Sequence, residues 1–327
     1  MRLWKVVGSI AAALIVVVGL GLTFAPVIYA ELWPVSFRLH LPMKPPAMIR
    51  GGTLTGPALG TVVDGYWRVQ KIAPDTYAIG EPQNDPDNYE YLLIGKTRAL
   101  LIDAGLTSTH DIHTALATLT QLPVTVIPTH LHFDHTNGLR FFHSIALIDV
   151  PETRSRVKDG MVHLSRYEYM GWFLPQGPPV FAVTEWVKPD GFIDLGGRSV
   201  QVLWTPGHTA TSASFYDPAA KLLFTGDLIY PTSLYAFLPD SSLSAYEATA
   251  TRLLATLPAD TTIYGGHCCR NDATTQAPWL GMKDLRDVQH AVAAIENGTS
   301  KGRGFILRRF PVNSRMTMIT LYPFGNR

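Results

Sequence analysis

A dense group of metal-ligand residue types constrains this chain more than any other feature. Residues 130–135 read His-Leu-His-Phe-Asp-His and directly follow the run VTVIPT. The β-branched run ending at a proline predicts a buried strand, so His130, His132, Asp134 and His135 would lie at its carboxyl end. Three imidazoles and a carboxylate are costly to bury together unless a cation satisfies them. The fold must therefore place this segment around a metal ion.

Three further ligand-type residues each follow a predicted strand and a glycine. They are His208 in Pro-Gly-His-Thr, Asp227 in Thr-Gly-Asp and His267 in Gly-Gly-His. Glycine permits the tight turn that such a position needs. The repeated arrangement predicts that these three residues join the 130–135 group in one metal site.

The order of the remaining runs predicts an α/β fold with two sheets. The β-rich runs TYAIG, YEYLLIG and RALLIDAG precede helical spacing at 109–122 and the strand before His130. A second set, SVQVLW, ASFYD and KLLFTGD, precedes a predicted helix at 243–257 and the strand TTIYGGH. Strands and helices that alternate in two halves predict a four-layer αβ/βα sandwich.

The N-terminal segment predicts a membrane anchor rather than part of this fold. Residues 6–30 carry no charge, and roughly 25 apolar residues suffice to cross a ~30 Å hydrocarbon core as a helix. A cleaved signal peptide is the alternative, but the end of the segment is a poor cleavage site. Arg2 and Lys5 precede the segment, which predicts a cytoplasmic N-terminus and a single-pass protein with its catalytic domain on the periplasmic side.

We expect three regions: the anchor at 1–30, a linker at 31–65 that is rich in Pro and Gly, and a catalytic domain at 66–327. Residues 157–181 interrupt the strand pattern and predict an aromatic cap or loop insertion. Its residues Tyr167, Trp172 and Phe173 would line a substrate pocket, since such pockets are largely apolar; packing in the core is the alternative.

Composition excludes one class of partner. The formal net charge is +1, which gives no basic field of the kind that neutralises a phosphate backbone, so nucleic acid is not an expected partner. Oligomeric state stays open.

The seven ligand-type residues resemble the pattern of the metallo-β-lactamase superfamily, from about Tyr66 to the C-terminus. The resemblance implies that one metal is held by His130, His132 and His208, that a second is held by Asp134, His135 and His267, and that Asp227 bridges them. Asp103, in Ile-Asp-Ala-Gly, resembles the family's strand-end acid near the site, with a simple turn cap as the alternative.

The Asp227 position bears on the reaction, because family members that cleave β-lactams usually lack an aspartate there. The resemblance therefore points to ester, thioester and lactone hydrolases, including the glyoxalase II type. Two cations ~3.5–4 Å apart can share a water and lower its pKa towards ~7, which makes a metal-bridging hydroxide the expected nucleophile. Asp134 would accept or relay its proton. Zinc suits histidine-rich ligation, and iron or manganese is also possible.

Tyr230 and its surroundings bear on the substrate. A phenol at this position could donate to a carbonyl oxygen as charge builds, and the spacing from Asp227 is similar to that in acyl-homoserine-lactone lactonases. Residues 206–254 resemble the metallo-β-lactamase-domain acyl-coenzyme A thioesterases of animals. An exported domain would meet little coenzyme A, so we expect a small hydrophobic acyl ester, thioester or lactone.

Two other functions stay open from the sequence. Persulfide dioxygenases resemble this fold and use a single iron, and a membrane-tethered protein could bind metal without catalysis. Seven ligand-type residues exceed the four of a closed structural zinc site, which favours an open, reactive centre.

Overall fold

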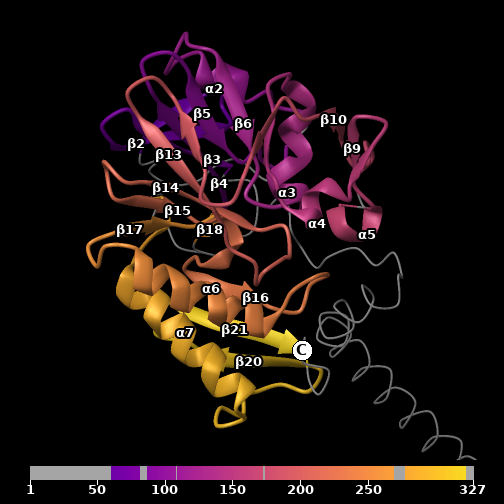
Figure 1. Cartoon of the computed structure of the whole chain (residues 1–327), viewed down its shortest axis with the longest axis vertical. Helices are drawn as coiled ribbons and strands as arrows, with labels where there is room; N and C mark the ends of the chain where they lie inside the picture. Colours follow the sequence, from indigo (N-terminus) through magenta and orange to yellow (C-terminus); the bar gives the residue numbers. More distant parts are fainter. Residues whose placement is uncertain (1–59, 82–86, 108, 172–173, 269–276, 322–327) are drawn as a thin grey trace, which may run out of the picture.

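The computed structural model describes residues 60–81, 87–107, 109–171, 174–268 and 277–321 (Figure 1). Its first large sheet has the order β1-β2-β3-β4-β5-β6, and β18 pairs with the start of β4. The strands are β1 Thr61–Val63, β2 Trp67–Ala73, β3 Thr76–Glu81, β4 Asp87–Ile94, β5 Ala99–Ile102, β6 Val124–Ile127 and β18 His267–Cys268.

The second large sheet has the order β12-β13-β14-β15-β17-β19. Its strands are β12 Phe192–Asp194, β13 Ser199–Trp204, β14 Ala213–Asp217, β15 Leu222–Phe224, β17 Thr262–Tyr264 and β19 Trp279–Gly281. Within these two sheets, the described strands pair in parallel only between β5 and β6 and between β15 and β17.

Three apolar clusters show how the layers pack. Side chains alternate between the two faces of a strand. Leu100 and Ile102 of β5 therefore belong to the same apolar cluster as Val202 and Phe215 of the second sheet, while Leu101 belongs to the cluster on the opposite side. A third cluster lies between the second sheet and the helices α6 (Leu243–Thr256) and α7 (Met282–Glu296). The predicted arrangement of two sheets between outer layers is confirmed.

The remaining elements are short and lie around these sheets. They are α2 His113–Leu116, α3 Phe133–Thr136, η1 Asn137–Phe141, β7 Ala146–Ile148, α4 Pro151–Arg154, β8 Val157–Lys158, β9 Met161–His163, α5 Arg166–Tyr169, β10 Val180–Ala182, β11 Glu185–Val187, η2 Gly226–Leu228, β16 Thr232–Tyr235, β20 Leu307–Pro311 and β21 Met316–Leu321. Strands β16, β21 and β20 form a small sheet beside α7 (Figure 1).

The structure differs from three expectations of detail. Strand β1 lies inside the segment 31–65, for which a linker was predicted, and it pairs with β2. The first sheet therefore begins before residue 66. The helix expected at 109–122 is one turn long, α2, in a segment rich in threonine, whose branched side chain disfavours helix. The described part of 157–181 is a three-stranded sheet, β10-β9-β8, with the short helix α5.

The predicted membrane anchor at 1–30 lies outside the described residues. In the part of the chain that the structure describes, no helix has the length and apolar character needed to span a membrane.

Candidate metal centre

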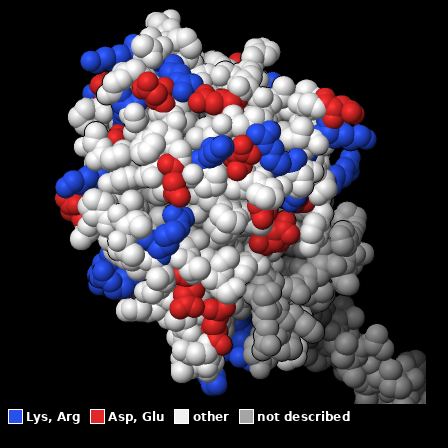
Figure 2. Space-filling view, viewed as in Figure 1, with Lys and Arg blue, Asp and Glu red and all other residues white. Residues whose placement is uncertain are grey.

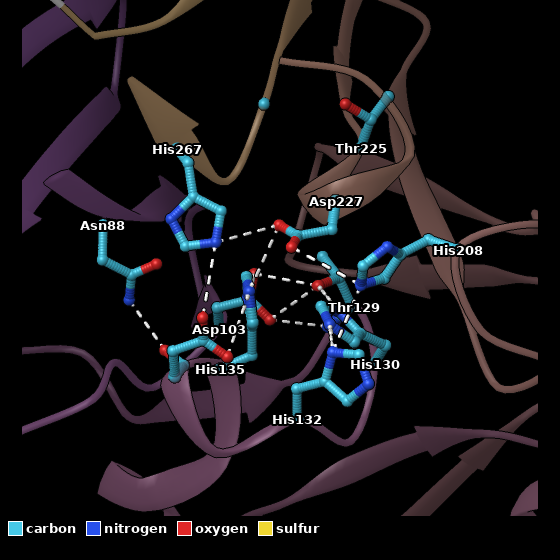
Figure 3. Close-up of polar contacts among 12 residues, drawn as sticks. Asn88, Asp103, Thr129, His130, His132, His135, His208, Thr225, Asp227 and His267 are labelled. Atoms are coloured by element: carbon cyan, nitrogen blue, oxygen red, sulfur yellow. Dashed lines mark hydrogen bonds and ion pairs between the residues drawn. The ribbon is translucent and has the colours of Figure 1, made fainter. Parts of the chain in front are cut away.

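Strand ends of both sheets deliver the seven predicted ligands to one place (Figure 3). His130 follows β6, and α3 begins after His132 and contains Asp134 and His135. The other three ligand-type residues lie beyond β13, β15 and β17, respectively, and are His208, Asp227 and His267. The parallel pairs β5–β6 and β15–β17 end at this edge, which explains why residues far apart in sequence converge here.

Three imidazoles form the first donor group. His130 Nε2 lies 2.8 Å from His132 Nδ1, and His208 Nε2 lies 3.2 Å from the same atom. The outer nitrogens are held by the protein: His208 Nδ1 donates to the Tyr235 carbonyl at 2.9 Å, and His130 Nδ1 lies 3.1 Å from Thr129 Oγ1. The nitrogens that face one another are therefore available to share a cation.

Asp134, His135 and His267 form the second donor group. His267 Nε2 lies 3.5 Å from Asp134 Oδ2, and His135 Nε2 lies 3.8 Å from Asp134 Oδ1. His135 Nδ1 donates to Asp103 Oδ2 at 2.9 Å, which turns its Nε2 towards the group. That buried Nε2 has no hydrogen-bond partner, as expected of an atom shaped to meet a cation.

Asp227 lies between the two donor groups and offers one oxygen to each. Its Oδ2 is 3.5 Å from His208 Nε2 in the first group. Its Oδ1 is 3.3 Å from His135 Nε2 and 3.2 Å from His267 Nε2 in the second, and this buried oxygen accepts no hydrogen bond. A carboxylate placed in this way can bridge two cations, so the residues present fit a pair of divalent ions.

The protonation states of the first group suit cation binding. Burial lowers the pKa of His132 to about 3, and the neighbouring His208 adds to the effect. Burial also holds the pKa of His130 well below its usual range and lowers that of His208. All three rings are thus neutral near pH 7 and keep the lone pair that a metal ligand needs.

The second group attracts positive charge. Burial opposes protonation of His267, but Asp227 and Asp134 outweigh it and raise the pKa to about 9. Burial would raise the pKa of Asp227, yet His267 and His135 outweigh it, so the pKa lies well below its usual range. The ionised carboxylates therefore favour a cation at this position.

Asp103 supports the site from the end of β5. The side chain is 1% exposed and accepts from the Thr129 backbone N–H at 2.6 Å and from His135 Nδ1. Asp103 therefore has both of the roles that the sequence suggested as alternatives. It caps the turn before His130, and it orients a ligand-type histidine.

Tyr230 lies behind His267 rather than in an open pocket. The two ring centroids are 5.2 Å apart, and Tyr230 is fully buried. Its hydroxyl has no hydrogen-bond partner, and burial holds its pKa well above the usual range, so it is a neutral donor. Contact with a substrate stays a prediction.

The described aromatic residues of the 157–181 segment pack against the core. Tyr167 is half-buried against the cluster on the outer face of the first sheet, and Tyr169 is fully buried with its hydroxyl bonded to Asn137 Oδ1 at 2.8 Å. The prediction that Trp172 and Phe173 line a pocket falls on residues outside the described part.

One residue at the site was not predicted from the sequence. Asn88 of β4 donates from Nδ2 to the Asp134 carbonyl at 2.7 Å (Figure 3). Two fully buried carboxylates, Glu81 and Glu90, accept from the same nitrogen. The available signal was Glu90, a carboxylate within the predicted strand at 89–95, since a buried polar group needs a partner.

Known proteins are similar to this chain in sequence. The family model described as "Metallo-beta-lactamase superfamily" matches residues 89–267. The acyl-coenzyme A thioesterase MBLAC2 of Gallus gallus is 29% identical over 187 residues, which are 50% of this chain and 65% of that protein. The hydroxyacylglutathione hydrolase of Mesorhizobium japonicum is 38% identical over 85 residues, 26% of this chain and 32% of that protein.

A solved structure shows the same fold. The metallo-beta-lactamase from Pontibacter korlensis matches with a TM-score of 0.52 at 18% identity, over 69% of this chain and 99% of that one. The chain covers less than two thirds of the length of the curated relatives above, so it shares the domain with them and not their full extent. With more than half of its residues matched by the family model, the chain belongs to the metallo-beta-lactamase superfamily.

Proposed function

We propose that this protein is a hydrolase that uses two divalent metal ions to cleave an acyl ester, thioester or lactone with an apolar portion. The observation that carries the proposal is the position of Asp227, with one oxygen facing each donor group. His130, His132 and His208 would hold one ion, and the second donor group would hold the other. The nitrogen-rich first group favours zinc, with iron or manganese as alternatives.

Such an ion pair supplies a nucleophile at neutral pH, by lowering the pKa of water, and polarises the scissile carbonyl. Asp134 is suited to proton transfer because it is the most accessible of the seven, with 13% of its side chain exposed. His135 and His267 outweigh the effect of burial and lower the pKa of Asp134, so it is ionised and can accept a proton. Tyr230 can donate a hydrogen bond to developing negative charge if a substrate reaches its hydroxyl.

The relatives support acyl chemistry. One is named an acyl-coenzyme A thioesterase and another a hydroxyacylglutathione hydrolase, and both names describe cleavage of an acyl group from a thiol carrier. We therefore keep acyl thioesters among the candidate substrates, together with the hydrophobic esters and lactones that a domain outside the cytoplasm would meet. A single-iron dioxygenase would leave the second donor group without a function, which weighs against that alternative.

We also propose that residues 6–30 anchor the protein in a membrane, with the catalytic domain on the periplasmic side. This placement would favour acyl substrates with long apolar chains. The full chain should then stay with the membrane fraction after alkaline carbonate washing and be released by detergent. Release by carbonate would contradict the anchor and leave the reaction untouched.

Nucleic acid is not a proposed partner. On the face shown in Figure 2, basic and acidic side chains are interspersed without a continuous patch of either sign. The expectation that nucleic acid is not a partner rests on the net charge of +1.

The reaction is tested by measuring metals per chain and hydrolysis on the same sample. The detergent-purified chain would be assayed on an acyl thioester, an aryl ester and an acyl lactone. We expect two zinc-like ions per chain, hydrolysis of at least one substrate and a large loss of hydrolysis in Asp227→Ala. One iron per chain, no hydrolysis and oxygen consumption with a persulfide would replace the proposal with the dioxygenase function.

A further inference from the structure

Asn88 lies directly opposite His267 where β4 pairs with β18. The two residues are partners in the antiparallel register, so their side chains lie on the same face of the sheet. Asn88 is completely buried and His267 is 5% exposed. A ligand-type histidine and a buried amide are thus held side by side by the backbone.

The orientation of the Asn88 amide is determined by its surroundings. Its Nδ2 lies 2.7 Å from the Asp134 carbonyl oxygen, 3.1 Å from Glu81 Oε2 and 3.0 Å from Glu90 Oε1. The Asp134 carbonyl oxygen can only accept a hydrogen bond, so this end must be the NH₂ group. Asn88 Oδ1 therefore points the other way, and Figure 3 shows it turned towards the His267 ring.

Two buried atoms of complementary type lie on these paired residues without hydrogen-bond partners. His267 Nε2 faces Asp134 and Asp227, so a neutral ring that binds a cation through this atom carries its proton on Nδ1. His267 Nδ1 is buried and has no hydrogen-bond partner in the structure. Asn88 Oδ1 is buried and has none either. One is a donor without an acceptor, and the other is an acceptor without a donor.

We propose that Asn88 is a positioning residue for the second metal ion, which rests on the proposed function. Its amide oxygen accepts the Nδ1–H of His267, directly or through one water molecule, while its amide nitrogen holds the Asp134 backbone. One side chain thereby fixes two of the three residues in the second donor group. Glu81 and Glu90 keep the amide in this orientation.

The effect should be confined to the second ion. In the first donor group the outer nitrogens have other partners: His208 Nδ1 bonds the Tyr235 carbonyl and His130 Nδ1 faces Thr129 Oγ1. Asn88 makes no hydrogen bond to either ring. Loss of the Asn88 amide should therefore lower the affinity for the second ion alone, whereas a general loss of stability would lower both affinities.

The test is a zinc titration of the metal-free full chain in competition with a chromophoric chelator, which resolves two affinities. In Asn88→Ala we expect the second ion to bind ~10–100-fold more weakly, as for loss of other groups that orient metal ligands, with the first affinity unchanged. The matched control is Asn137→Ala. Asn137 is equally buried, but its amide bonds the Leu106 carbonyl and the Tyr169 hydroxyl, so we expect both affinities to stay as in the wild type.

The wild-type chain provides a second test if the alanine variant does not fold. In the zinc-loaded protein the Nδ1–H proton of His267 should exchange slowly with solvent in an NMR spectrum, because Asn88 Oδ1 accepts it, and rapid exchange would contradict this bond. Equal weakening of both ions, or an unchanged second affinity, would overturn the role of Asn88. Wild-type protein that binds fewer than two ions would instead overturn the proposed function itself.

Discussion

Single hydrogen bonds decide which atoms of this site can meet a cation. Asp103 accepts from His135 Nδ1, and the Tyr235 carbonyl accepts from His208 Nδ1. Each bond holds the outer nitrogen of the ring and turns Nε2 towards the centre. The protein therefore sets the orientation of these two rings before any ion binds, which reduces the reorganisation that binding requires.

Tyr230 gives a prediction that separates catalysis from stability. Its hydroxyl is buried without a partner, so Tyr230→Phe should not lower the melting temperature. If the hydroxyl donates to the transition state, kcat should fall roughly 10²-fold while metal content stays the same. In contrast, Tyr91→Phe loses a 2.6 Å bond to the Gly265 carbonyl and should cost ~1 kcal/mol of stability. An unchanged kcat in Tyr230→Phe would show that this tyrosine only packs.

Glu90 predicts a pH dependence of stability. Burial, together with Glu81 and Asp103, holds its pKa well above the usual 4.5, so the folded chain keeps a proton that the unfolded chain releases above that pH. Stability from this group is complete below about pH 4.5 and falls as pH rises, by up to ~1.4 kcal/mol per unit, until the folded pKa is passed. Glu90→Gln should remove this loss. Denaturant unfolding at pH 5 and pH 8 would measure it, and an identical pH dependence in both proteins would contradict it.

The ligand-bearing elements owe their convergence to strand order. β5 and β6 run parallel, as do β15 and β17, so the turns that follow them meet at one edge of the fold. Gly266 lies in one of these turns: its N–H donates to the Gly226 carbonyl and its carbonyl accepts from the Tyr89 N–H. The turn after β17 is thereby fixed to η2 on one side and to β4 on the other.

The site leaves no room for a side chain at Gly266. A Cβ there would lie 2.8 Å from Asp227 Oδ1 and 2.9 Å from His135 Cε1, which is too close for either group to keep its place. Gly266→Ala should therefore weaken metal binding and activity. Gly281→Ala is the control, because a Cβ at Gly281 meets no atom within 4 Å. Equal metal content in the two variants, measured by elemental analysis, would contradict the expected crowding.

The strand ends that carry the ligand-type residues could be predicted from the sequence, but the buried polar residues that contact them could not. His130, Asp227 and His267 each follow a clear β-rich run, so their convergence could be expected. Glu90 lies within such a run and Asn88 directly before it, and the alternation of strand side chains does not reveal which buried polar groups meet across a sheet. The small sheet at 157–182 was also missed, because its strands are only two or three residues long.

At the scale of the whole molecule, Arg198 joins the two halves. It lies between β12 and β13 of the second sheet and bonds Asp217 Oδ2 at 2.7 Å. It also reaches the turn between β2 and β3 of the first sheet, donating to the Asp75 carbonyl and to Thr76 Oγ1, each at 2.7 Å. Since the site is built from strand ends of both sheets, this connection helps to fix the distance between them.

Arg198→Ala should therefore be strongly destabilising. The substitution leaves the Asp217 carboxylate, whose side chain is 2% exposed, without the Arg198 guanidinium. Removing one partner of a buried ion pair costs ~3–5 kcal/mol. The measurement is the denaturant midpoint. Lys221→Ala is the control: its pair with Asp260 is exposed, so the midpoint should hardly move. Equal shifts in the two variants would contradict a connecting role for Arg198.

The central claim is that two metal ions share Asp227. The most direct measurement is anomalous X-ray scattering at the zinc edge from crystals of the zinc-loaded full chain. We predict two peaks ~3.5–4 Å apart, one among His130, His132 and His208 and the other at the second donor group, with Asp227 between them. A single peak under saturating zinc, or two peaks of which only one lies next to Asp227, would contradict the claim.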